Sequence, residues 1–172
     1  MWKLNKPDVK TAKEKDVEKL VQIKKFNNCD SIKKYLKELY ENYDTQNGYV
    51  SNKQLEDIQE DEAQLIYKAY DLTYKDKQLN YIRAELCEKV LLCPYCGINQ
   101  VDTLDHYMPK STYKVLAVCR MNLIPMCPTC NTLKGEKTYS NFVHCYYQEF
   151  PSKIQFLKAN VKIEKDLFTI SF

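Results

Sequence analysis

The chain has 172 residues, of which 44% are hydrophobic and 28% are charged, and its mean hydropathy is −0.57. This composition is typical of a soluble globular protein and excludes a disordered chain or a membrane protein. No apolar stretch approaches the roughly 18 residues that a membrane helix requires, so we expect no membrane partner. The first residues also lack the apolar core of a secretory signal, which predicts a cytoplasmic protein.

The formal net charge is +3, and the positive excess lies in the second half of the chain. Residues 1–91 contain 17 basic and 17 acidic side chains, which leaves the whole excess to residues 92–172. A small excess favours a nucleic-acid partner only weakly, because strong binders carry dense clusters of positive charge.

Residues 8–91 are predicted to be helical, because apolar side chains recur there at helical spacing. A weak stripe over 17–21 comes first. The clearest stripe follows Asp30, an N-cap candidate, and ends at Asn47-Gly48, a pair that commonly terminates helices. Two more stripes occupy residues 55–70 and 79–90. No Pro/Gly-rich linker follows, so we expect these helices to pack directly on the rest of the chain.

Residues 92–172 have a different sequence pattern, in which turn residues and cysteines separate short apolar runs. The runs at 101–104, 115–118 and 123–126 indicate a small β-hairpin rather than helices. A helix is predicted near 141–147, and alternating side chains over 161–163 and 167–171 predict two edge strands. The expected fold class is therefore α+β.

Two Cys-x-x-Cys pairs, Cys93 with Cys96 and Cys127 with Cys130, are separated by 30 residues. A two-residue gap lets both thiolates of a pair reach one metal ion, and four thiolates close a tetrahedral structural zinc site. A reducing compartment favours this interpretation over disulfides. The remaining cysteines follow no ligand spacing and are expected to be small buried side chains. They are Cys29, Cys87, Cys119 and Cys145.

Two other cysteine chemistries are alternatives to structural zinc. Cys93-Pro-Tyr-Cys96 is similar to the redox motif of glutaredoxins, but that motif stands near the start of a βαβ unit, and about ninety helical residues precede it here. Zinc nucleobase deaminases need a glutamate two residues after the histidine. His106 is followed by Tyr107 and Met108, so this glutamate is missing.

The segment between the cysteine pairs carries further polar signals in a fixed order. It contains Leu104-Asp105-His106-Tyr107-Met108-Pro109-Lys110-Ser111 and Asn122-Leu123-Ile124-Pro125, and the second pair continues as Asn131-Thr132-Leu133-Lys134-Gly135. This combination closely resembles the HNH (ββα-metal) endonuclease family, whose pattern is Cys-x-x-Cys, Asp-His, Asn-Leu, then Cys-x-x-Cys followed by His or Asn and Lys-Gly. The resemblance covers the 43 residues from Cys93 to Gly135.

The resemblance implies a treble-clef-like unit that hydrolyses phosphodiester bonds in nucleic acid, with DNA favoured over RNA. His106 corresponds to the general base, and Asn122 to the residue that steadies the loop carrying this base. Asp105 and Asn131 correspond to the ligands of one catalytic Mg2+ or Mn2+ ion. The family often has His at the position of Asn131. The oxygen ligand that asparagine offers instead suits these hard cations.

Three basic residues, Lys110, Arg120 and Lys134, are candidates for contacts with phosphate groups. Two local features are also expected. Pro128 should open a short helix that Gly135 ends. A bend or loop is expected at Asp105 and His106, because neighbouring residues of a straight strand point in opposite directions.

The overall prediction is a helical region over residues 1–91 and an HNH nuclease unit with a small αβ extension over 92–172. The variant Leu-Asp-His-Tyr-x-Pro-Lys-Ser, with the later Asn-Phe-Val-His-x-Tyr-Tyr, is similar to HNH subunits of bacterial Septu-type anti-phage systems. This narrower resemblance implies a partner ATPase that docks on the helical surface. The alternative is a non-catalytic zinc module that binds nucleic acid or a protein, which would not need the polar set described above.

Overall fold

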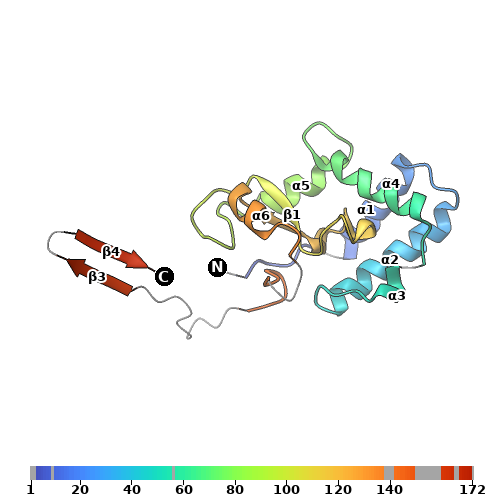
Figure 1. The fold of residues 1–172 in the computed structure, drawn as a ribbon. Helices are drawn as coiled ribbons and strands as arrows, with labels where there is room; N and C mark the ends of the chain where they lie inside the picture. Colours follow the sequence, from blue (N-terminus) through green and yellow to red (C-terminus); the bar gives the residue numbers. More distant parts are fainter. Residues whose placement is uncertain are drawn as a thin grey trace.

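The computed structural model describes residues 3–8, 10–55, 57–137, 142–149, 160–164 and 167–171. Helices dominate the part before residue 92, as the apolar spacing predicts (Figure 1). They are α1 (Lys10–Ile23), α2 (Cys29–Thr45), α3 (Asn52–Leu55), α4 (Glu60–Ala69), the 3-10 turn η1 (Tyr70–Thr73) and α5 (Asn80–Cys87).

Two details of the helix prediction are wrong. The N-cap of α2 is Asn28 rather than Asp30, because the Asn28 side chain accepts a 3.1 Å hydrogen bond from the backbone N–H of Ser31. The stripe over residues 55–70 is divided between two helices, α3 and α4. The run of acidic residues at 60–62 explains the new start, since carboxylates in a first helical turn interact favourably with the helix dipole.

The segment between the two cysteine pairs folds as a hairpin followed by a helix. Strand β1 (Thr103–His106) pairs antiparallel with β2 (Leu123–Met126), and α6 (Pro128–Lys134) follows at once. The helix begins at Pro128 and ends before Gly135, as predicted. The run at 115–118 is not a strand. It lies in the long β1–β2 connection, where η2 (Lys114–Leu116) and η3 (Arg120–Asn122) form instead.

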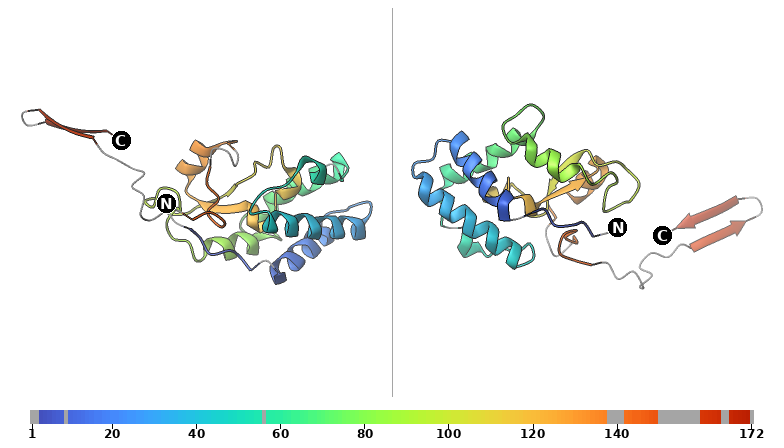
Figure 2. Two further views of the ribbon diagram at one scale, coloured as in Figure 1. Left: turned by 90° about the horizontal axis from the view of Figure 1, so that it is seen from below. Right: turned by 180° about the vertical axis from the view of Figure 1, so that it is seen from behind.

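One hydrophobic core joins the helical region to this ββα unit. The helices gather on one side of the β1–β2 hairpin and α6 lies on the other (Figures 1 and 2). Two buried tyrosines connect the layers, because Tyr40 donates to the carbonyl of Val115 at 3.1 Å and Tyr70 donates to that of Leu104 at 2.6 Å. The helices therefore support both the β1 strand and the loop that follows it.

The segment after α6 differs from the prediction. Residues 142–149 form a single turn rather than a helix, with the N–H groups of Tyr147 and Gln148 both donating to the carbonyl of His144. Side chains take the N–H groups that a helix would use: His144 Nδ1 accepts from Tyr146 N, and Gln148 Oε1 accepts from His144 N. Local bonds of this kind compete with helix formation.

The two predicted edge strands are present. They are β3 (Asn160–Glu164) and β4 (Leu167–Ser171), which pair antiparallel, so the C-terminal extension contains a β-hairpin. Within the described ranges, no helix combines the length and the apolar character needed to cross a membrane.

Candidate metal centre and catalytic site

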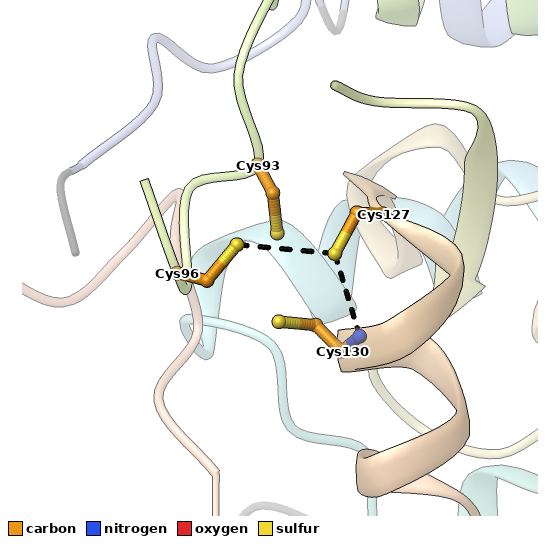
Figure 3. A group of neighbouring side chains, drawn as sticks. All are labelled: Cys93, Cys96, Cys127 and Cys130. Carbon is orange, nitrogen blue, oxygen red and sulfur yellow. Dashed lines mark hydrogen bonds between the residues drawn. The ribbon is translucent and has the colours of Figure 1, made fainter. Parts of the chain in front are cut away.

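The four cysteines of the two pairs converge on one point (Figure 3). Their sulfur atoms all lie within 4.8 Å of one another, and the Cys96 and Cys127 sulfurs are 3.9 Å apart. A disulfide would bring sulfurs to about 2.0 Å. Four sulfurs at about 2.3 Å from a tetrahedral zinc ion are separated by roughly 3.8 Å. The donor set therefore fits a structural zinc ion and does not fit a disulfide.

Backbone hydrogen bonds orient the thiols of this four-cysteine cluster. The first pair sits on a turn in which Gly97, at φ 70°, donates to the carbonyl of Cys93 at 2.8 Å. Backbone N–H groups of Asn99 and Ile98 hold the pKa of the Cys96 thiol down to about 6, which favours the thiolate that binds metal. At the second pair, Cys127 is the N-cap of α6, and its sulfur accepts from the N–H of Cys130 at 3.4 Å.

The other four cysteines are free thiols outside the four-cysteine cluster. Cys119 and Cys145 are buried and Cys87 is half-buried, in line with their predicted packing role. Cys29 is exposed, contrary to the prediction, because it occupies the first turn of α2 on the surface.

Asp105 and Asn131 both lie at the contact between β1 and α6. Asn131 Nδ2 donates to Thr103 Oγ1 at 3.1 Å, and Asp105 Oδ2 lies 3.0 Å from the ammonium of Lys134. Burial raises the pKa of Asp105 to about 6, although Lys134 and the N–H of His106 oppose this shift. Asp105 Oδ2 is buried, and its close partner within the described residues is the ammonium of Lys134. The carboxylate therefore already lies beside a cation.

His106 occupies the end of β1 with its ring on the helical side. The ring packs against Tyr70 with centroids 4.5 Å apart, and Nε2 lies 2.9 Å from the carbonyl oxygen of Ala117. A carbonyl only accepts hydrogen bonds, so Nε2 carries the proton and Nδ1 carries the lone pair. Burial lowers the pKa of His106 to about 3, and the charges of Lys110 and Lys134 add to this effect. The imidazole is therefore neutral at pH 7.

The expected bend between Asp105 and His106 is absent. Both residues belong to the regular strand β1, and the backbone bends one step later, at Tyr107 and Met108. The strand accommodates both side chains because each has its own partner element. Asp105 contacts Lys134 of α6, whereas His106 contacts Tyr70 of η1. The structure thus brings Asp105 close to α6, and holds His106 against the helical region.

Asn122 is fully buried and holds the loop that follows His106. Its Oδ1 accepts from the N–H of Met108 at 2.7 Å, while its Nδ2 donates to the carbonyls of Met108 at 3.1 Å and Leu116 at 3.2 Å. The side chain therefore joins the two ends of the loop that starts at β1. This geometry supports the loop-steadying role that the family pattern assigns to Asn122.

Two residues outside the family pattern complete this network. The Tyr43 hydroxyl donates to Asn122 Oδ1 at 3.0 Å and lies 3.2 Å from His144 Nε2. The Tyr43 hydroxyl has one proton, which it donates to Asn122, so His144 Nε2 must donate to the Tyr43 oxygen. This tautomer leaves Nδ1 as an acceptor, in agreement with its bond from Tyr146 N. The sequence places Tyr43 on the apolar face of a predicted helix and predicts that His144 is a packing residue or a contact on the substrate side. Only their contacts across the fold reveal the chain of hydrogen bonds.

Gly48 makes room for His144 in this network. A Cβ atom at Gly48 would lie 2.5 Å from His144 Cδ2, and the backbone of Gly48 has φ 91°, where other residues are strained. A side chain at this position would therefore displace the His144 ring that donates to Tyr43.

Two of the three basic residues predicted to contact phosphate have partners inside the protein. Arg120 is only 8% exposed, and its guanidinium pairs with Asp16 of α1 and Glu85 of α5. Lys134 is 1% exposed and donates to the carbonyl of His106 at 2.7 Å, besides pairing with Asp105. Both cations are occupied inside the protein. The third, Lys110, is partly exposed and makes no ion pair among the described residues.

Comparison with known families decides the identity of this segment. Residues 93–137 match the model of the HNH endonuclease family. These residues form an HNH endonuclease domain with a four-cysteine metal site. No curated protein and no solved structure gives a significant match to the chain. The HNH domain covers the four-cysteine cluster, β1, β2 and α6, whereas Tyr43, Tyr70 and His144 lie outside it.

Removal of one zinc ligand should unfold the HNH domain. Purified wild-type protein is expected to carry one zinc ion per chain, measured by elemental analysis. Cys127→Ser should lose this zinc and several kcal/mol of stability, since structural zinc supplies on the order of 10 kcal/mol to such segments. The exposed Cys29→Ser variant is the control and should keep both. Full zinc content in Cys127→Ser would contradict the assignment.

Loss of the Tyr43 hydroxyl should loosen the loop after His106. Tyr43→Phe leaves Asn122 Oδ1 and His144 Nε2 each short of a buried partner, which should cost about 1–3 kcal/mol in unfolding free energy. Tyr35→Phe is the matched control, because its hydroxyl bonds to the carbonyl of Gln54 in a half-exposed position. Denaturant unfolding measures both. Equal losses in the two variants would argue against a special role for Tyr43.

Proposed function

We propose that the protein is a metal-dependent endonuclease that hydrolyses phosphodiester bonds in nucleic acid, with His106 as the general base. The observation that carries the proposal is the bond from His106 Nε2 to the Ala117 carbonyl, inside an HNH domain. This bond fixes the tautomer and leaves Nδ1 free to accept a proton. The lowered pKa keeps the base neutral throughout the physiological pH range.

The reaction requires removal of a proton from water as the water attacks phosphorus. In the proposal His106 Nδ1 takes this proton, and a positioned base of this kind contributes roughly 10²- to 10⁴-fold to the rate. Asn122 keeps the loop after β1 in place, so that the imidazole stays oriented. The Ala117 carbonyl also stabilises the ring once it is protonated, because the bond that it accepts from Nε2 then comes from a charged donor.

Asp105 and Asn131 would hold the catalytic ion. A buried carboxylate on β1 and a side-chain amide on the facing helix α6 form an oxygen donor set that suits Mg2+ or Mn2+. When bound, such an ion supplies Lewis-acid stabilisation of charge on the phosphate and the leaving oxygen. Lys134 balances the Asp105 carboxylate and ties the carbonyl of His106 to α6.

A non-catalytic zinc module is the second candidate, and two observations favour it. His106 is only 7% exposed, and the Asp105 carboxylate already has a cationic partner in Lys134. A binding module would tolerate both features. The enzyme and the module differ in one measurable property, which is cleavage that depends on His106.

The decisive test replaces His106 by alanine in the full chain. Plasmid DNA and a structured RNA are incubated with wild-type and variant protein in Mg2+ or Mn2+. We expect wild-type cleavage, faster on DNA, and a loss of roughly 10²- to 10⁴-fold in His106→Ala. Zinc content and thermal unfolding serve as controls for folding. Absence of wild-type cleavage on both substrates, or equal cleavage by the variant, would favour the binding module.

We further propose a cytoplasmic role in bacterial anti-phage defence, with an ATPase as partner. Support comes from the resemblance of the Asp-His and Asn-Phe-Val-His segments to Septu-type subunits, and a reducing cytoplasm suits eight free thiols. The outer surface of the helical region is the expected docking face, because its inner surface is used by the HNH domain.

Co-purification tests the partnership. The tagged full chain, isolated from its native host, should bring down a protein with ATPase activity in a fixed ratio. The preparation is treated with added nucleases first, so that a bridge of nucleic acid cannot mimic a contact. An eluate without ATPase activity after this treatment would contradict the partnership while leaving the endonuclease proposal intact.

A further inference from the structure

The cations around β1 and its loop fall into two groups. Lys134, Arg120 and Lys114 each pair with a carboxylate, so the protein itself neutralises their charge. Lys110 and Arg83 have no carboxylate partner among the described residues, and both contact Tyr70, whose ring packs on His106. Their charge is therefore available to an external anion.

Lys110 is held by two aromatic rings. It lies four residues after His106 in the loop, and its ammonium is 4.5 Å from the ring centroid of Tyr70 and 4.7 Å from that of Tyr67. A cation–π contact positions an ammonium without cancelling its charge, because the ring is neutral. The side chain is partly exposed, so it can also contact a ligand.

Arg83 belongs to α5 and is held in a similar way. Its guanidinium lies 4.7 Å from the ring centroid of Tyr74, and it donates to the Tyr70 hydroxyl at 3.3 Å and to the Asp102 carbonyl at 3.4 Å. Both acceptors are neutral and both bonds are long. The guanidinium is thus oriented but keeps its full positive charge and spare N–H donors.

Tyr70 connects these two cations to the proposed base. Its hydroxyl is anchored on the Leu104 carbonyl at 2.6 Å, next to Asp105 in β1, and its ring packs on His106. One buried tyrosine therefore contacts Lys110, Arg83 and the His106 ring. A ligand that bridges the two cations would lie beside His106.

We infer that Lys110 and Arg83 form a phosphate-binding pair that holds the nucleic-acid backbone next to His106. The inference rests on the proposed function, since it takes the substrate of that site to be a phosphodiester chain. Lysine binds phosphate as a point charge and arginine as a planar donor set, so the pair would recognise the backbone and not the bases. Arg83 lies outside the HNH domain, which gives the helical region a direct part in substrate binding.

Binding is measured without cleavage, so that the two proposals can fail separately. Fluorescent DNA and RNA oligonucleotides are titrated with the full chain in a His106→Ala background at salt concentrations of about 50–200 mM. Lys110→Gln and Arg83→Gln should each weaken binding by about threefold or more at the lower salt. Each should also reduce the slope of log affinity against log salt by roughly 0.7–0.9, the value for one lost phosphate contact.

Two sets of variants control for charge and folding. Lys34→Gln removes an exposed charge from α2 and should leave both affinity and slope unchanged. Arg83→Lys and Lys110→Arg preserve the charge and should keep the wild-type salt slope. If the glutamine variants are unstable, this second pair still tests the inference, because a loss of slope despite retained charge would count against it.

The outcomes separate the inference from the nuclease proposal. Wild-type affinity and slope in both glutamine variants would overturn the phosphate-binding pair, even if the wild-type protein cleaves nucleic acid. A reduced slope in these variants, with no cleavage by the wild type, would support the pair and remove the endonuclease function.

Discussion

The convergence of four cysteine sulfurs is the constraint on which the site depends. The two pairs flank a segment of 30 residues, and their shared metal would join its ends. Because Cys127 also caps α6, the same contact fixes where that helix begins and hence which side chains it turns toward β1. Asn131 and Lys134 reach Thr103 and Asp105 as a result. A short hairpin and a seven-residue helix would not hold this arrangement by packing alone.

The helical region supplies hydrogen-bond donors to buried polar groups of the HNH domain. Three buried tyrosines cross from it to the ββα unit: Tyr40 reaches the loop, Tyr43 reaches Asn122, and Tyr70 reaches β1 and His106. Each tyrosine contributes apolar area to the common core and one directed hydrogen bond to a polar group that would otherwise be buried without a partner. The helices therefore help to position the residues around His106, whatever else binds to their outer surface.

Local chemistry made part of this structure predictable from sequence. The Cys-x-x-Cys spacing, the start of α6 at Pro128 and its end at Gly135 each depend on a few adjacent residues. The internal partners of Arg120 and Lys134 could not be predicted, because a basic side chain gives no indication of its partner. Arg120 pairs with Asp16, which is 104 positions away. Periodicity also predicts a helix where the structure has a turn, at 144–147. It does not show that side chains accept hydrogen bonds from the N–H groups of this turn.

The bond between Tyr43 and His144 has a consequence for the order of assembly. These residues are 101 positions apart, and Tyr43 leaves the ribosome long before His144 does. All four cysteines of the metal site precede His144 in the chain, so they are synthesised before it. The orientation of the Asn122 amide becomes complete only when the later segment has docked beside Gly48. The chain of hydrogen bonds from Asn122 through Tyr43 to His144 therefore extends beyond the family match, which covers residues 93–137.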